Sequence, residues 1–206
     1  MARIQEPPRH FAELALVTQD VAPSDLLRLA WEEPRTHLRF GRDARFRFDA
    51  PSREFGVLYA AFDLPTAFAE TVLRDAPQSL PGGVVVPLDF AAIQARRVVT
   101  FRAGLVPRAL RLIKLYDEGL AAAHTDNQIA VRDHYPTTQR WGAAFHAHPL
   151  AADGIVYMSR YMGARRSVAL FERCREAIDV DTVTPLLEHA GFAELALRFN
   201  LAIDRP

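Results

Sequence analysis

Cysteine, lysine and net charge are nearly absent from this chain of 206 residues. It has one cysteine, Cys174, and one lysine, Lys114, so 24 of its 25 basic residues (25 minus 1) are arginines. A single cysteine excludes a disulfide framework, and it excludes a zinc site made of several cysteines from one chain. Lys+Arg and Asp+Glu number 25 each, and this balance does not indicate binding of nucleic acid through overall charge.

Long apolar runs are also missing. No stretch approaches the ~18 apolar residues that a membrane-spanning helix needs. The first 20 residues, MARIQEPPRHFAELALVTQD, are interrupted by charges and do not resemble a signal peptide. We therefore expect a cytoplasmic protein with no membrane partner.

The common cofactor and metal signatures are absent as well. Gly82-Gly83 lacks the spacing of the Rossmann or P-loop phosphate motifs. His146 and His148 are close in sequence, but no cysteine or acidic ligand belongs to the same motif, so the end of a helix before Pro149 is the simpler explanation. We expect no metal and no bound cofactor.

Half of the residues are hydrophobic, which is enough for a substantial core in a single main domain. Strand and helix patterns alternate without a regular βαβ rhythm, which favours the α+β class. The patterns predict strands at 55–61, 84–90, 97–101, 155–159, 167–171 and 195–203. They predict helices at 11–17, 26–31, from 63 through 70, 105–116, 137–146 and 181–191.

The two helices expected near the N-terminus suggest that the chain has two parts. Residues 1–36 are predicted to form a helical extension packed on the main domain, which then comprises residues 37–206. A cap, a dimerisation arm or a partner-binding element are the alternatives for this segment. A homo-oligomer could form through this arm or through the apolar last strand.

Residues 39–70 hold the residue types from which a reactive site is built. An arginine-rich and aromatic segment comes first, a strand that contains Tyr59 follows, and a helix after Asp63 carries Glu70. Arginine pairs with phosphate oxygens, an aromatic face holds a flat ring, and a carboxylate stabilises developing positive charge. The stretch therefore suits an anionic substrate with an aromatic ring and a bond whose cleavage leaves positive charge.

The same stretch resembles the RES domain, a bacterial family named for an arginine, a glutamate and a serine. The resemblance covers about Leu38 to Phe171. It rests on Leu38-Arg39-Phe40, Arg47-Phe48 with Pro51, Leu58-Tyr59-Ala60-Ala61, Ala67-Phe68-Ala69-Glu70, and Ser159 in GIVYMSRY. Arg45-Phe46 is a competing register for the second arginine pair, and the asparagine that often follows the family's serine region has no counterpart here.

The resemblance implies an ADP-ribosyltransferase-like fold, with split mixed sheets around a cleft and flanking helices. It implies a toxin of a toxin–antitoxin pair that cleaves the nicotinamide–ribose bond of NAD+, as a glycohydrolase or phosphorylase, and that an Xre-type antitoxin neutralises. Glu70, Arg39 and Tyr59 would be catalytic, and Arg39, Arg47, Tyr59 and Ser159 would bind NAD+. The alternatives are transfer of ADP-ribose to a specific protein and a non-catalytic module that keeps the fold.

Each of these residues also has an ordinary structural explanation. The arginines could form a solvated face, Tyr59 could be a core residue, and Glu70 could pair with Arg74 on an exposed helix surface. Ser159 could satisfy a backbone group at the end of a strand.

Overall fold

The structure, a computed structural model, describes residues 5–75, 86–131 and 135–204. Eight strands form one mixed sheet in the order β1-β6-β7-β8-β3-β2-β5-β9, and β10 pairs with β4 in a separate two-stranded sheet. The pairs within the large sheet are antiparallel except for β6 with β7. The strand bounds are β1 Thr18–Val21, β2 Leu27–Trp31, β3 Val57–Ala61, β4 Val86–Asp89, β5 Arg96–Ala103, β6 Leu110–Leu115, β7 Gly154–Met158, β8 Arg166–Phe171, β9 Ile178–Pro185 and β10 Leu201–Asp204.

The large sheet is nearly divided in its middle. Strands β2 and β3 share a single registered pair, Leu27 with Ala61, whereas β3 and β8 share five and β2 and β5 share five. One half is therefore β1-β6-β7-β8-β3 and the other is β2-β5-β9, and the two halves diverge beyond that contact. This arrangement confirms the expected α+β fold.

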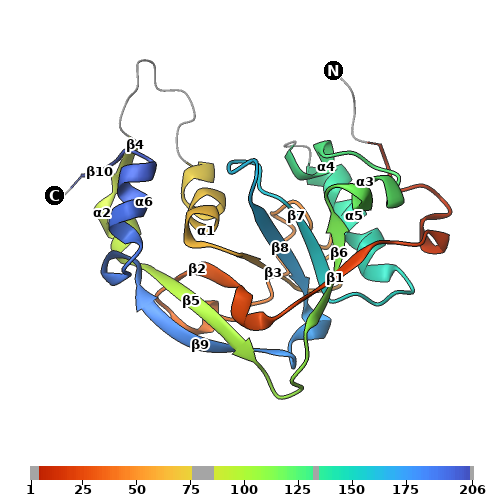
Figure 1. Ribbon diagram of the computed structural model, residues 1–206, viewed down its shortest axis with the longest axis horizontal. Coiled ribbons are helices and arrows are strands. Elements are labelled where there is room, and N and C mark those ends of the chain that lie inside the picture. Colours follow the sequence, from red (N-terminus) through yellow and green to blue (C-terminus); the bar gives the residue numbers. More distant parts are fainter. Residues whose placement is uncertain (1–4, 76–85, 132–134, 205–206) are drawn as a thin grey trace.

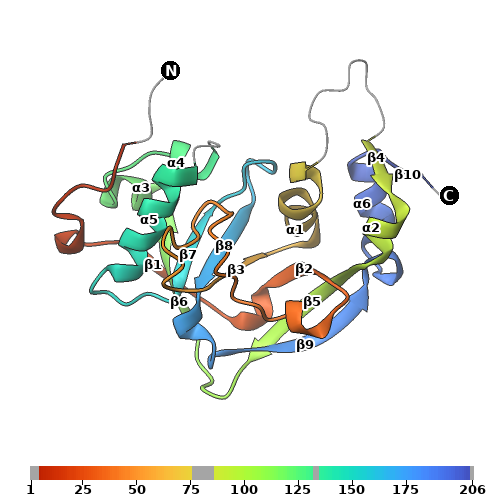
Figure 2. The same ribbon diagram turned by 180° about the vertical axis from the view of Figure 1, so that it is seen from behind.

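Short helices cover the two halves. The helix bounds are α1 Leu64–Thr71, α2 Phe90–Gln94, α3 Glu118–Ala122, α4 Gln128–Val131, α5 Tyr135–Ala147 and α6 Phe192–Arg198. In both ribbon views α1 lies between a group formed by α2 and α6 and a group formed by α3, α4 and α5 (Figure 1, Figure 2). Helix α1 thus follows directly from central strand β3 and stands where the halves separate.

The helix that carries Glu70 forms for local reasons. Asp63 is its N-cap, and its Oδ1 accepts hydrogen bonds from Thr66 N at 2.8 Å and Thr66 Oγ1 at 2.7 Å. Pro65 occupies the first turn, where its missing N–H costs nothing. Phe68 and its neighbours pack into a core cluster, which leaves Glu70 on the half-buried side. The predicted helix start and the strand before it are confirmed.

Three predicted elements in the first 116 residues are wrong. The segment 26–31 contains strand β2, Leu27–Trp31, and no helix, and residues 11–17 contain only a short 3-10 turn, Phe11–Glu13. Residues 105–116 contain strand β6, whose apolar residues are buried on both faces because it lies between β1 and β7. Burial on both faces removes the period-two pattern of a strand and leaves spacing that resembles a helix.

Two predictions for the C-terminal part are also wrong: a predicted helix contains a strand, and part of a predicted strand is a helix. Residues 178–185 form edge strand β9 instead of a helix capped by Asp181. Residues 192–198 form helix α6, where alternation had predicted a strand: Leu195 is 1% exposed, whereas Leu197 is 84% exposed. The strand begins only at Leu201.

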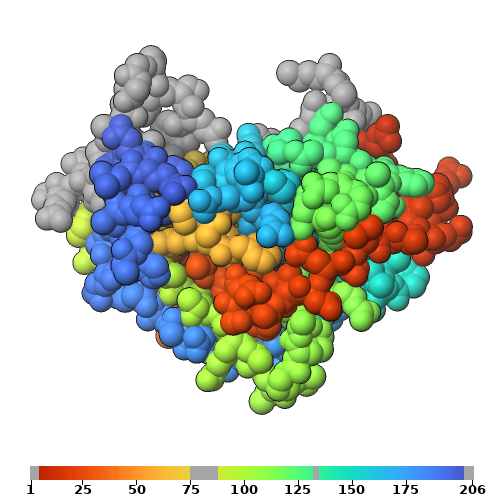
Figure 3. Space-filling model, in the orientation of Figure 1, coloured from red at the N-terminus to blue at the C-terminus, as the bar shows by residue number. Residues whose placement is uncertain are grey.

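The N-terminal residues take part in the large sheet. Strand β1 pairs with β6 in one half, and β2 lies between β3 and β5 in the other. In the space-filling view these residues, in red, run along the face of the molecule across both halves (Figure 3). Thr18–Val21 and Leu27–Trp31 are therefore strands of the main sheet, joined through a 3-10 turn at Pro23–Asp25, where a helical extension was expected.

Candidate functional site

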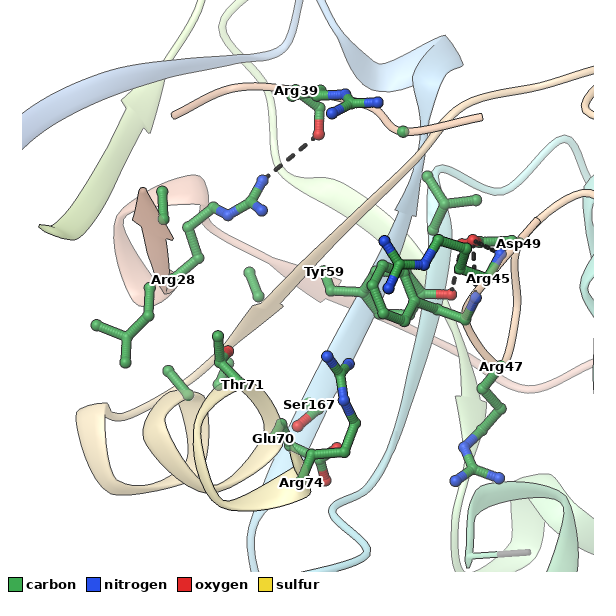
Figure 4. A pocket seen from close by; sticks show the side chains of 18 of the residues that line it. Arg28, Arg39, Arg45, Arg47, Asp49, Tyr59, Glu70, Thr71, Arg74 and Ser167 are labelled. Atoms are coloured by element: carbon green, nitrogen blue, oxygen red, sulfur yellow. Dashed lines mark hydrogen bonds between the residues drawn. The ribbon is translucent and has the colours of Figure 1, made fainter. Parts of the chain in front are cut away.

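A pocket of about 390 Å³ opens where the two halves of the sheet diverge. Its lining comes from strands β2, β3, β5, β7 and β8, from helices α1 and α5, and from the segments that follow β2, α1 and β7 (Figure 4). It includes Arg39, Arg47, Tyr59 and Glu70, four of the five residues predicted from the sequence. The fold thus brings these four residues to one pocket, as their closeness in the sequence suggested.

Glu70 is held in one orientation by two donors. Its Oε1 accepts a hydrogen bond from Ser159 Oγ at 2.6 Å and another from Arg160 N at 2.9 Å. Both donors come from the turn after β7, which α1 contacts directly through Glu70. Hydrogen bonds to a carboxylate are among the stronger ones in proteins, so this side chain is preorganised.

Ser159 lies behind Glu70. Its side chain is 2% exposed, and Ser159 is not among the described residues that line the pocket. Besides donating to Glu70, its Oγ accepts from Met162 N at 3.1 Å and Tyr161 N at 3.3 Å. The geometry links Ser159 to the carboxylate rather than to the open space of the pocket.

The Tyr59 hydroxyl belongs to a small buried network. It donates to Asp49 Oδ1 at 2.9 Å and accepts from Phe48 N at 2.9 Å. Asp49 Oδ2 also accepts from the backbone N–H groups of Arg45 and Phe46, each at 2.9 Å. Burial and the nearby Asp49 raise the pKa of Tyr59 well above its ordinary value, so the phenol stays protonated. Its ring remains at the pocket wall.

Three further tyrosines line the side of the pocket near Glu70: Tyr135, Tyr157 and Tyr161. Burial, followed by the charge of Glu70, raises the pKa of Tyr157. The Arg47 guanidinium lies 5.5 Å from the Tyr135 ring centroid, and its Nη1 donates to Ile129 O at 3.4 Å. Arg47 is 8% exposed, whereas Arg45 is exposed, and both line the pocket. The two candidates for the second matched arginine thus differ in burial, and Arg47 is the buried one.

A second group of arginines lies on the β2 side. Arg39 is exposed and pairs through Nη2 with both carboxylate oxygens of Asp43 at 3.0 Å. Arg28 extends from β2 to the Arg39 carbonyl, at 3.4 Å, and its Nε is buried without a hydrogen-bond partner among the described residues. Burial and the charges of Arg39 and Arg96 lower the pKa of Arg28 to about 10. Three guanidinium groups this close favour an anionic ligand.

Ser167 is the second serine near the carboxylate. It lines the pocket from β8, opposite Tyr157 in the strand register, and Figure 4 places it beside Glu70. Its Oγ is buried and has no hydrogen-bond partner in the part of the chain that the structure describes. An unpaired buried hydroxyl costs about 1–3 kcal/mol, and a polar group of a ligand at the pocket floor would offset that cost.

The thiol of Cys174 is buried and does not line the pocket. Burial, followed by the charge of Asp153, raises the pKa of the Cys174 thiol to about 12, so the thiol is protonated at neutral pH. Within residues 5–75, 86–131 and 135–204, no group of three or more His, Cys, Asp or Glu side chains could hold a metal ion. The same residues contain no helix long and apolar enough to cross a membrane.

Sequence reasoning missed Arg28, Asp49 and Ser167. Arg28 was hidden because its segment was predicted to be a helix outside the main domain. Asp49 stands in the loop before β3 and carries no motif of its own; only the fold brings it to Tyr59. Ser167 was assigned simply to a strand, and only the register with Tyr157 places it at the pocket.

The family comparison covers most of the chain. Residues 25–190 match the RES domain family. A search of curated protein sequences finds no significant match. Among solved structures, the fold is similar to the "M.tuberculosis MbcT-MbcA toxin-antitoxin complex", with a TM-score of 0.60 at 14% identity, over 92% of this chain and 98% of the other.

Proposed function

The chain belongs to the RES domain family, and we propose that it cleaves the bond between nicotinamide and ribose in NAD+. The observation that carries the proposal is the Glu70 carboxylate, fixed by Ser159 Oγ and Arg160 N in a pocket lined by arginines and tyrosines. These are the groups that a flat cationic leaving ring, a ribose and a pyrophosphate require.

Glu70 would act at the bond that breaks. The electron pair of the glycosidic bond leaves with the nicotinamide nitrogen, which becomes neutral, and C1′ of the ribose gains positive charge. A fixed carboxylate beside the ribose stabilises that oxocarbenium-like transition state and can accept a hydrogen bond from a ribose hydroxyl. The two hydrogen bonds to Oε1 fix the orientation of the carboxylate, so it needs little reorganisation during the reaction.

Ser159 would be a positioning residue rather than a direct contact of NAD+. Its hydroxyl is used by Glu70 and by two backbone N–H groups, so it determines where the carboxylate points. This assignment keeps Ser159 in the site and changes the role expected from the sequence.

The aromatic side of the pocket would hold nicotinamide. Tyr59 presents its ring while its hydroxyl is bound to Asp49, and Tyr157 lies close enough to Glu70 for the carboxylate to shift its pKa. Flat rings bind well to such faces. Arg47, beside Tyr135, would bind ribose or phosphate oxygens from the same side.

The arginines of the β2 side would bind the pyrophosphate. Arg28 has a buried, unpaired Nε, and Arg39 carries an exposed guanidinium whose pairing with Asp43 is open to solvent. An exposed ion pair is worth ~1 kcal/mol or less, so a phosphate can replace the carboxylate as the partner of Arg39. Arg39 and Arg28 would then clamp the diphosphate together.

The acceptor of the ADP-ribosyl group distinguishes three reactions. Water gives ADP-ribose and a released proton, inorganic phosphate gives ADP-ribose phosphate, and a protein side chain gives an ADP-ribosylated protein. Labelled NAD+ incubated with a cell lysate separates the third reaction from the first two. Labelled protein bands would identify a transferase, whereas labelled small products alone would identify a hydrolase or phosphorylase.

We also propose that the protein is the toxin of a toxin–antitoxin pair. The support is family membership and a fold similar to that in a toxin–antitoxin complex. An antitoxin of the Xre type would neutralise it by covering the basic rim of the pocket, from Arg39 to Arg47. Acidic or polar residues of such a partner would meet these guanidinium groups.

Growth and NAD+ content of cells test the proposal. Expression of the wild-type chain in bacteria should stop growth and deplete NAD+, and Glu70→Gln should relieve both effects. Glu194→Gln, an exposed carboxylate on α6 paired with Arg198, is the matched control and should remain toxic. Growth arrest by Glu70→Gln at equal expression, with the NAD+ pool intact, would overturn the proposed reaction.

A further inference from the structure

Trp31 and Arg96 form a flat, stacked pair at the end of the pocket away from Glu70. They are opposite each other in the register of β2 and β5, and the guanidinium carbon of Arg96 lies 3.5 Å from the centroid of the Trp31 ring. Both residues line the pocket, and Trp31 is 43% exposed. An exposed tryptophan at a pocket is typical of a surface that binds a ring.

The backbone of the pair is held by strand pairing and by a nearby turn. Thr36 Oγ1 donates to the carbonyl of Trp31 at 2.9 Å, and Thr36 lines the same pocket. Strands β2 and β5 are in register from Leu27 with Thr100 to Trp31 with Arg96. Paired strands therefore present a planar guanidinium stacked on an indole, and such a surface can stack on a further flat ring.

The spacing along the sheet separates this pair from the carboxylate. Ser167, Ala61 and Leu27 form one row across three strands, so Leu27 is about 10 Å from Ser167 at the spacing of neighbouring strands. Trp31 lies four residues further along β2, about 13 Å away at the rise of a strand. The direct distance from Ser167 to Trp31 is then on the order of 16 Å. Along β2, Arg28 lies between Leu27 and Trp31.

We propose that the Trp31–Arg96 pair binds the adenine ring of the dinucleotide. This inference rests on the proposed function, because it takes nicotinamide to lie near Glu70 and the pyrophosphate near Arg28. A purine on the far side of the pyrophosphate then reaches the exposed pair, where it stacks on a planar cationic and aromatic surface. The pair would make the enzyme prefer NAD+ over nicotinamide mononucleotide, which ends before this part of the pocket.

Steady-state kinetics with the two substrates test the pair. Trp31→Ala should raise the KM for NAD+ about tenfold, the low-to-middle range for loss of one base-stacking contact, and should leave kcat within about twofold. The kinetic constants for nicotinamide mononucleotide should not change. Trp31→Phe retains a ring and should recover most of the affinity, and Arg96→Lys, which keeps the charge but loses the plane, should raise the KM for NAD+.

The matched control is Leu197→Ala, which removes another large exposed apolar side chain, 84% exposed and outside the pocket lining. It should leave both substrates unaffected. Circular dichroism and thermal unfolding establish that each variant is folded. An unchanged KM for NAD+ in folded Trp31→Ala overturns the inference, and so does an equal loss with both substrates.

Binding of ADP gives a readout that does not depend on turnover. The chain has two tryptophans, and the second, Trp141, is fully buried. ADP should therefore change the fluorescence of the wild-type protein, and Trp31→Phe should abolish that change while calorimetry still detects ADP. If NAD+ is not cleaved but this pattern holds, the proposed reaction fails and the purine site stands; if ADP does not bind, the purine site is overturned.

Discussion

The hydroxyl of Tyr59 gives a prediction in which stability and substrate binding separate. Tyr59→Phe keeps the ring at the pocket wall and removes one oxygen atom. That oxygen donates to Asp49 Oδ1 and accepts from Phe48 N, each at 2.9 Å. The substitution therefore removes two hydrogen bonds and leaves a backbone N–H near Phe48 without its partner.

The expected loss follows from these two bonds. A hydrogen bond to a carboxylate contributes about 1.5–3 kcal/mol, and a buried N–H left unpaired costs about 1–3 kcal/mol. Partial solvent access to Tyr59 reduces the sum, so we expect the free energy of unfolding to fall by about 3 kcal/mol. For a domain of this size that corresponds to a drop in Tm of about 6–12 °C.

A double-mutant cycle measures the contact itself. Urea unfolding of Tyr59→Phe, Asp49→Ala and the double variant should give a coupling free energy of about 1.5 kcal/mol or more. The KM for NAD+ should change less than twofold in Tyr59→Phe, because the ring is retained. A coupling near zero would refute the network, and a tenfold rise in KM without loss of stability would mean that the hydroxyl binds substrate instead.

Three other substitutions give separate tests. Arg28→Lys should raise the KM for NAD+ about tenfold or more, because lysine lacks the planar fork that pairs with two phosphate oxygens; an unchanged KM would remove Arg28 from the site. Ser167→Ala should leave the free energy of unfolding unchanged or raise it by up to about 1 kcal/mol, since its hydroxyl is unpaired, while the KM for NAD+ rises; a clear loss of stability would show a contact within the protein. Burial, followed by the charge of Arg173, lowers the pKa of His146 to about 4, below its ordinary value near 6.5. The unfolded chain therefore binds more protons between these values, and stability should fall by about 1 kcal/mol as the pH drops from 7 to 5, allowing for partial exposure. Urea midpoints at both pH values measure this, and in His146→Phe the pH dependence over this window should be smaller by that amount; an equal pH dependence in the variant would contradict the assignment.

Short sequence signals were sufficient to predict the two elements that carry Tyr59 and Glu70. The cap at Asp63, the proline after it and the apolar strand before it predict that Tyr59 and Glu70 come from consecutive elements, and they do. The helix predicted at 137–146 likewise lies within α5. A helix that packs on the core with one face has apolar residues at helical spacing, so its sequence reveals it. The family resemblance and the α+β class are confirmed, whereas the roles of Arg39, Arg47, Tyr59, Glu70 and Ser159 stay predictions.

The other side of the pocket depends on contacts between distant segments. Residues 27–31 form a strand because β5, about 70 positions later, pairs with them along their whole length. Their own sequence has the spacing of a helix, so Arg28 and Trp31 were placed outside the site. Ser167 is hidden for the same physical reason, because its neighbour Tyr157 is set by strand register, which a single segment does not reveal. Asp49 lies in a loop, and its hydrogen bond to Tyr59 exists only once that loop is folded against β3.

The most direct measurement is release of nicotinamide from NAD+ by the purified full chain, with and without inorganic phosphate. The wild type is compared with Glu70→Gln and with the control Glu194→Gln. The account predicts release by the wild type and the control, and a loss of at least a hundredfold in Glu70→Gln, about 2.7 kcal/mol of transition-state stabilisation. Stimulation by phosphate would identify a phosphorylase. Equal release by Glu70→Gln, or no release by folded wild-type protein free of any partner in either buffer, would contradict it.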